Sequence, residues 1–139
     1  MTKELKCKDK VKAECTSRIS DLRKLWAAYC SGENDGYVED LGNLNEYGLS
    51  FDYVPPGTFT DQKIGFFRYQ ISWGGPSDEF RFYTNPDFSC YKVEYWFLDW
   101  FDGAKVVLSG KRLELLLEIF ENFRECQTVE YVYNQAIAE

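Results

Sequence analysis

The chain contains no histidine, and its five cysteines lie far apart in the sequence. Without an imidazole, Ser-His-Asp and Cys-His nucleophile systems, histidine acid–base catalysis and histidine-ligated metals are excluded. No Cys-x-x-C pair offers the closely spaced ligands of a zinc site. These absences remove the commonest routes to catalysis and metal binding. We therefore predict a protein that is not an enzyme and that holds no metal and no cofactor.

Long apolar runs are also missing. No stretch approaches the ~20 residues that cross a bilayer, and the N-terminus lacks the apolar segment of a secretory signal peptide. The interpretation is a cytoplasmic protein with free thiols and no membrane partner. A chain of 139 residues is long enough for one independent core, so we expect a single domain over residues 1–139. No pattern specifies an oligomeric state.

Charge is divided unevenly along the chain. Residues 1–31 carry eight Lys/Arg against four Asp/Glu, whereas residues 32–139 carry eight against nineteen, and the net charge is −7. The field of such a chain repels phosphate, so direct nucleic-acid binding is not expected despite the lysines of the first segment. The asymmetry favours association with a charged protein partner.

Hydrophobic spacing predicts an α+β fold. Apolar residues three and four apart indicate a helix over residues 3–30, ended by Ser31-Gly32. Alternating residues and turn signals predict strands at 47–54, 64–73, 78–84, 90–100 and 104–108. Helices are expected at 111–126, with Leu113, Leu116, Leu117 and Phe120 inward, and at 128–138. The predicted architecture is an antiparallel four- to five-stranded meander sheet with the long N-terminal helix and the C-terminal helix packed on one face.

The meander predicts which turns lie together. Strands of an antiparallel sheet reverse at each turn, so the turn after Trp73 and the turn at 99–103 share one end of the sheet. The start of the first strand joins them there. This predicted rim combines acidic residues with large aromatic anchors, as interfaces do. Its members are Glu39, Asp40, Glu46, Trp73, Asp78, Glu79, Asp99, Trp100, Phe101 and Asp102.

A second candidate site lies on the helix at 111–126. Glu114, Glu118, Glu121 and Glu125 are spaced by four, three and four residues, so they line one helix face. At about 1.5 Å rise per residue, their charges recur about every 5 Å. One DNA strand carries a charge about every 3.4 Å. The row therefore has the character of a nucleic-acid mimic.

Plainer interpretations stay open for both sites. Trp73 and Trp100 are also consistent with core residues, and the acids with solvated turns and an ordinary outer helix face. The rim acids could bind Mg²⁺ or Ca²⁺ unspecifically, although the stretch around Gly36 does not have the ligand positions of an EF-hand. A carboxylate pair such as Asp99 with Asp78 could also serve a small hydrolase.

Three stretches carry a resemblance to known proteins: LNEYGLSFDY (44–53), YQISWGGPSDEF (69–80) and YWFLDWFDG (95–103). They resemble small acidic accessory proteins of conjugative plasmids, integrative elements and phages, which often travel with anti-restriction and anti-CRISPR genes. The resemblance implies a counter-defence role in the cytoplasm of a bacterial host.

Together, these patterns favour a non-enzymatic inhibitor of a host nucleic-acid-targeting defence complex, of the anti-CRISPR or anti-restriction type. The acidic residues would cover the basic surface of that complex that normally holds DNA or RNA. The alternatives are a protein–protein adaptor that does not compete with nucleic acid and, less favoured, the carboxylate-based hydrolase.

Overall fold

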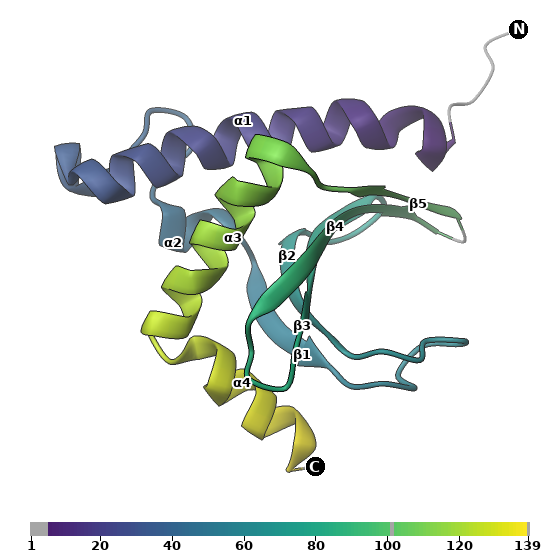
Figure 1. Cartoon of the computed structure of the whole chain (residues 1–139). Helices are drawn as coiled ribbons and strands as arrows, with labels where there is room; N and C mark the ends of the chain where they lie inside the picture. The colour runs from purple at the N-terminus through teal and green to yellow at the C-terminus, as the bar shows by residue number, and fades with distance from the viewer. Residues whose placement is uncertain (1–5, 101, 139) are drawn as a thin grey trace, which may run out of the picture.

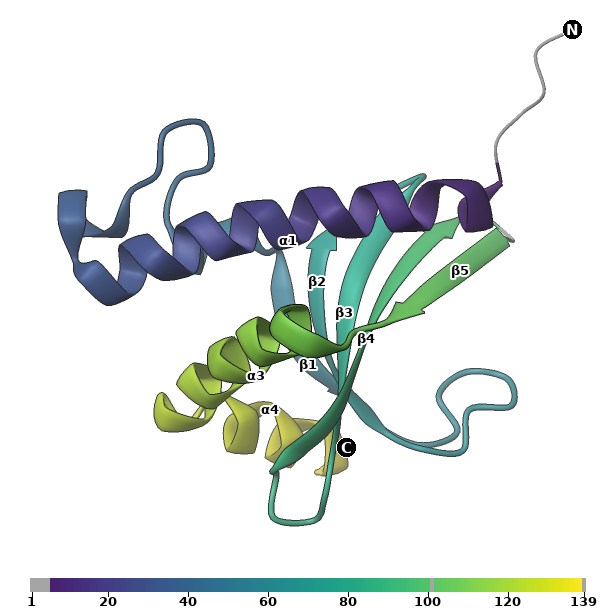
Figure 2. The same cartoon turned by 45° about the horizontal axis from the view of Figure 1, so that its top comes forward.

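The computed structural model describes residues 6–100 and 102–138. Within them, a five-stranded antiparallel sheet has the order β1-β2-β3-β4-β5. The strands are β1 (Ser50–Val54), β2 (Phe66–Ser72), β3 (Ser77–Thr84), β4 (Cys90–Asp99) and β5 (Asp102–Val107). The helices are α1 (Cys7–Ser31), the 3-10 turn η1 (Glu33–Gly36), α2 (Leu44–Tyr47), α3 (Gly110–Glu125) and α4 (Thr128–Ile137). The predicted α+β fold is confirmed, as is the meander with helices on one face (Figures 1 and 2).

Helix α1 follows directly from its sequence pattern. An apolar stripe from Cys7 to Leu25 is buried, and the remaining faces are polar. The N-terminus is capped twice, because Asp9 accepts a hydrogen bond from the Lys6 amide (3.0 Å) and Asp102 accepts one from the Cys7 amide (2.8 Å). The helix ends at Gly32, which has a left-handed φ of 74°. Figure 1 shows α1 lying across the top of the sheet and of α3.

The two faces of the sheet differ in what covers them. Alternate residues of β2 and β3 point toward the helices, and Phe67, Phe80 and Phe82 are fully buried there. Helices α1, α3 and α4 pack on this inner face (Figure 2). The opposite, outer face is closed mainly by its own long side chains, with Phe66 and Tyr83 beneath them. Aromatic pairs therefore fill the inner core, as in the Phe82–Phe120 stack at 4.9 Å between ring centroids.

Strand β1 begins later than the predicted residue 47. Tyr47 belongs to α2 and turns toward α1, where its hydroxyl donates a hydrogen bond to Asp21 (2.7 Å). Gly48 lies against the Tyr69 ring, and Leu49 is exposed. The polar contacts of Tyr47 with α1 thus override the alternating pattern that predicted a strand.

The buried face of α3 is also rotated from the prediction. Leu115, Leu116, Ile119 and Phe120 are buried, whereas Leu113 and Leu117 are only partly so. The reason is that α3 packs against three neighbours, the sheet, α4 and α1. Helix α1 covers the side of α3 that carries Leu115, a residue that the predicted inner face did not include.

Candidate functional site

The structure brings the two predicted hairpin turns together. Trp73 follows β2, and Trp100 follows β4. Their exposed fractions are 77% and 88%, so neither is a core residue. A β-carbon placed on Gly75 would lie 3.4 Å from Nε1 of Trp100 and 3.7 Å from a carboxylate oxygen of Asp99. The turns therefore touch and present large aromatic rings to solvent. Phe101, the third predicted anchor, lies outside the described residues.

Asp78 does not belong to the exposed part of this end, because it is 1% exposed. Its carboxylate accepts hydrogen bonds from Arg18 at 2.6 and 3.2 Å, from the Tyr95 hydroxyl at 2.6 Å and from Ser72. Burial alone would lower the pKa of Arg18, but its hydrogen bonds to Asp78 and Tyr47 raise that pKa above its usual range. Asp78 is thus a neutralised anchor for α1. The prediction that it forms a contact surface is wrong.

Glu79 is buried on the opposite face of the sheet, at 2% exposure. It pairs with Arg81 at 2.7 Å, and the Arg81 guanidinium lies 4.0 Å from the Trp96 ring centroid and 4.6 Å from that of Phe66. This packing removes Glu79 from solvent and cancels its charge. Glu79 therefore leaves the candidate contact surface as well.

Asp99 and Asp102 remain near the exposed tryptophans. Asp99 is half-buried and Asp102 is exposed. The hydrogen bond from the Cys7 amide is the main reason that the pKa of Asp102 is lowered. Asp102 thus caps α1, and it ties this end of the sheet to the helix N-terminus.

The other predicted rim acids lie elsewhere along α1. Glu46 belongs to α2, whose Tyr47 contacts Arg18 and Asp21 in the middle of α1. Glu39 and Asp40 follow η1, where Gly36 packs against the backbone of Ala28 and Tyr29. At about 1.5 Å per residue, that contact is roughly 30 Å from Cys7 and Asp102. The predicted rim is therefore not one cluster. Glu46 stays at the start of β1, where Tyr47 shares Arg18 with Asp78, whereas Glu39 and Asp40 follow η1 near the far end of α1.

The acidic row on α3 has the arrangement that its spacing predicts. Glu114, Glu118, Glu121 and Glu125 are all exposed along one face. Glu118 accepts a hydrogen bond from Nε1 of Trp26 (2.9 Å), and Glu121 pairs with Arg124 (2.7 Å). Among the residues that the structure describes, no Lys or Arg nitrogen lies within 4.0 Å of the carboxylates of Glu114, Glu118 and Glu125. This outward, largely unpaired row is the best-formed part of the candidate site.

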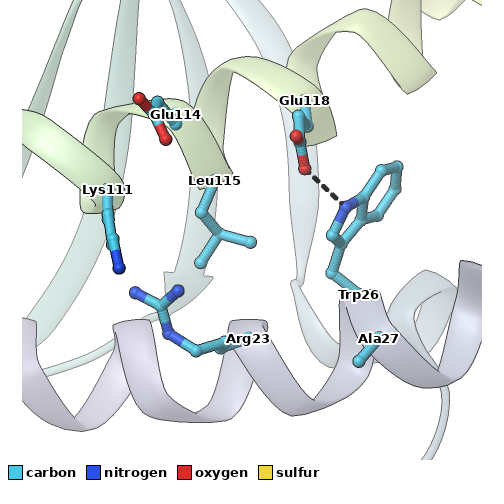
Figure 3. A pocket seen from close by; sticks show the side chains of 7 residues that line it. All are labelled: Arg23, Trp26, Ala27, Lys111, Glu114, Leu115 and Glu118. Atoms are coloured by element: carbon cyan, nitrogen blue, oxygen red, sulfur yellow. Dashed lines mark hydrogen bonds between the residues drawn. The ribbon is translucent and has the colours of Figure 1, made fainter.

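Two hollows flank Trp26 between α1 and α3. The first, of about 270 Å³, lies beside Arg23, Lys111 and Leu115. In Figure 3 the Glu118 carboxylate points toward Trp26, whereas Glu114 points away from Arg23. The second hollow, of about 340 Å³, is lined by Trp26, Leu117, Glu118, Glu121, Asn122 and Glu125. Trp26 continues the three- and four-residue apolar spacing of α1, which is typical of a core face, yet it is half-buried beside the glutamates. Sequence reasoning missed this position.

The acidic surface continues beyond α3. A third hollow, of about 320 Å³, joins Glu121 and Glu125 to Asp87 and Glu130 around Arg124. Asp87 accepts hydrogen bonds from the Ser89 hydroxyl and amide, which lower its pKa. We call the surface formed by Glu114, Glu118, Glu121, Glu125, Asp87 and Glu130 the acidic strip.

The described residues contain no group of three or more Cys, Asp or Glu side chains arranged to hold a metal ion. The carboxylate pair of Asp99 and Asp78 is not an accessible site, because Asp78 is buried against Arg18. Among the helices of the described residues, none is long and apolar enough to cross a membrane.

No family model, no curated protein and no solved structure matches the chain.

Proposed function

We propose that the chain is a non-enzymatic inhibitor of a nucleic-acid-targeting defence complex and that it acts through the acidic strip. The observation that carries the proposal is the row of four exposed glutamates on α3, three of them without a cation within 4.0 Å in the described part of the chain. The row spans about 16 Å of helix at about 1.5 Å per residue. That length corresponds to roughly five phosphates of one DNA strand.

The physical basis is competition for a positive surface. Lysines and arginines that hold DNA or RNA are arranged to meet a line of negative charge. The strip presents such a line on a helix, whose position is fixed by the buried residues Leu116 and Phe120. Complementary charge raises the rate of encounter and orients the partners, and apolar contacts slow dissociation. The resemblance of the central segments to accessory proteins of mobile elements favours a counter-defence setting.

The decisive experiment neutralises the strip without changing its shape. The variant E114Q/E118Q/E121Q/E125Q keeps side-chain length, and the new amide oxygen at position 118 can still accept the hydrogen bond from Trp26. The assay is protection of a target plasmid in bacteria that carry a restriction or CRISPR system. The wild-type protein is expected to protect in at least one system, and the variant to lose most of that protection.

A matched control changes the same number of exposed acids elsewhere. The variant E33Q/D35N/E39Q/D40N alters net charge equally, in the segment beside the end of α1. It is expected to keep protection. Equal losses in both variants would mean that net charge, and not the strip, is responsible, and protection unchanged by the first variant would refute the proposal.

A second candidate function is a protein–protein adaptor. The observation that favours it is the exposure of Trp73 and Trp100 at an end of α1 distant from Glu39 and Asp40. In that case W73A/W100A would abolish partner binding, and added DNA would not compete. Competition by DNA would instead favour the inhibitor.

A further inference from the structure

The hollow of about 340 Å³ between α1 and α3 combines apolar walls with negative charge. Trp26 and Leu117 supply apolar surface, and Glu118, Glu121 and Glu125 border it. An apolar groove edged by carboxylates suits a side chain with a long aliphatic part and a positive end. Lysine and arginine both fit this description, so the aromatic residue must decide between them.

Trp26 has a fixed orientation. Its ring stacks on Tyr29 with centroids 5.5 Å apart and planes 16° from parallel. Its Nε1 donates to Glu118 (2.9 Å), and the Tyr29 hydroxyl donates to Asn122 (3.1 Å). These two links join α1 to α3 on the groove side. The indole is therefore held in place before any ligand arrives, which reduces the entropy cost of binding.

The same chain shows how such a combination holds a guanidinium group. Arg81 lies 4.0 Å from the Trp96 ring centroid and pairs with Glu79 at 2.7 Å. Arg18 lies 5.8 Å from the Tyr47 centroid and pairs with Asp78 at 2.6 Å. In both places an aromatic ring and a carboxylate share one arginine. Lysines also occupy this combination at Glu94, where Lys105 lies 5.5 Å from the Trp96 centroid and Lys92 lies 4.4 Å from that of Tyr83. The difference is that a planar guanidinium group stacks flat on a ring and bonds a carboxylate through two nitrogens, which an ammonium group cannot do.

The groove repeats this combination, but its cation is not supplied from within the described residues. Neither Glu118 nor Glu125 has a Lys or Arg nitrogen within 4.0 Å there, and Arg124 is paired with Glu121. Arg23 and Lys111 belong to the hollow on the other side of Trp26 (Figure 3). A cation from a partner would complete the combination of ring and carboxylate in this groove.

We propose that this groove binds an arginine side chain of the partner protein, with the guanidinium against Trp26 and between Glu118 and Glu125. The inference rests on the proposed function, since it assigns the residue type that the strip recognises. It adds a preference for arginine over lysine, which a purely electrostatic mimic would not have.

The test uses the full chain and two capped tetrapeptides of equal charge, one of arginine and one of lysine. Affinity and the shift of the Trp26 indole N–H signal are measured by NMR titration at low salt. We expect the arginine peptide to bind about fivefold more tightly, the size of one exposed cation–π contact, and to shift the Trp26 signal more than those of Trp73 and Trp100.

Three variants separate the possible outcomes. E121Q/E125Q, which changes only exposed side chains, is expected to weaken both peptides, whereas E39Q/D40N should weaken neither. W26L, which removes the aromatic ring, should reduce the arginine preference toward onefold while the lysine peptide is little affected. If W26L is poorly folded, the preference of the wild-type protein and its indole shift still decide the question.

Equal binding of both peptides, weakened equally by E121Q/E125Q, would overturn the arginine site and leave the acidic strip intact. Failure of both peptides to bind, or binding that perturbs Trp73 or Trp100 in place of Trp26, would overturn the site and the proposed function together.

Discussion

Replacing Asp78 with alanine is expected to destabilise the protein by about 3–5 kcal/mol, because it removes one partner of a buried ion pair. Asp78 accepts hydrogen bonds from Arg18, Tyr95 and Ser72 and is almost completely buried. Its loss leaves a cation and a buried hydroxyl without an acceptor. It also releases the middle of α1 from the sheet. For a chain of this length the loss corresponds to a fall in Tm of roughly 10–20 °C.

The matched control is Asp52→Ala. Asp52 also binds an arginine through two hydrogen bonds, at 3.0 and 2.7 Å to Arg68, but its side chain is 43% exposed. Solvent-exposed pairs contribute about 0–1 kcal/mol, so D52A should change stability little. D78N, which keeps one acceptor oxygen, should fall between the two. Urea unfolding followed by circular dichroism measures all three, and a D78A cost below about 1 kcal/mol would refute the role assigned to Asp78.

Three further predictions concern the fold. Burial would raise the pKa of Glu94, but hydrogen bonds from Trp96, Tyr83 and Lys105 lower it below its ordinary 4.5. The stability that ionised Glu94 contributes is therefore present above pH 4.5 and lost as the pH falls. The drop in Tm between pH 6 and pH 3 should be smaller in E94Q than in the wild-type protein, and an equal drop would contradict this assignment. A methyl group on Gly48 would overlap the Tyr69 ring, so G48A should cost about 1–3 kcal/mol in chemical denaturation, and a neutral result would show that the ring can move aside. Cys30 and Cys126 are exposed, whereas burial raises the pKa of Cys90 to about 11 and also raises the pKa values of Cys7 and Cys15. At pH 8 a thiol reagent should label Cys30 and Cys126 rapidly and the other three cysteines slowly. Rapid labelling of Cys90 would contradict its raised pKa.

Most of the fold could be predicted because local pattern and long-range packing agree. Phe80 and Phe82 alternate with Arg81, and both phenylalanines face the core. The same alternation already indicated that Asp78 faces the core, which the prediction of an exposed acidic rim did not take into account. Asp78 lies two residues before Phe80, so it belongs to the inner face of β3 and not to an exposed turn.

The parts that sequence could not predict depend on contacts between distant segments. Trp26 and Glu118 are 92 residues apart, and no periodicity indicates that they meet. The segment at 33–40 is shaped by left-handed residues such as Asn34 and Asp40, with φ of 50° and 70°, which direct it along α1. The glutamate row on α3 was predictable in full, since it requires only helical spacing.

The anchoring of α1 bears on how the chain folds as it is made. Its contacts with Asp78, Glu118 and Asp102 span 60, 92 and 95 residues. A nascent chain emerging from the ribosome therefore carries the stripe from Cys7 to Leu25 uncovered until β3, β5 and α3 have been synthesised. Such non-local closure slows folding and leaves apolar surface open to chaperones in the interval. Helix α1 is thus translated well before the segments that hold it in place.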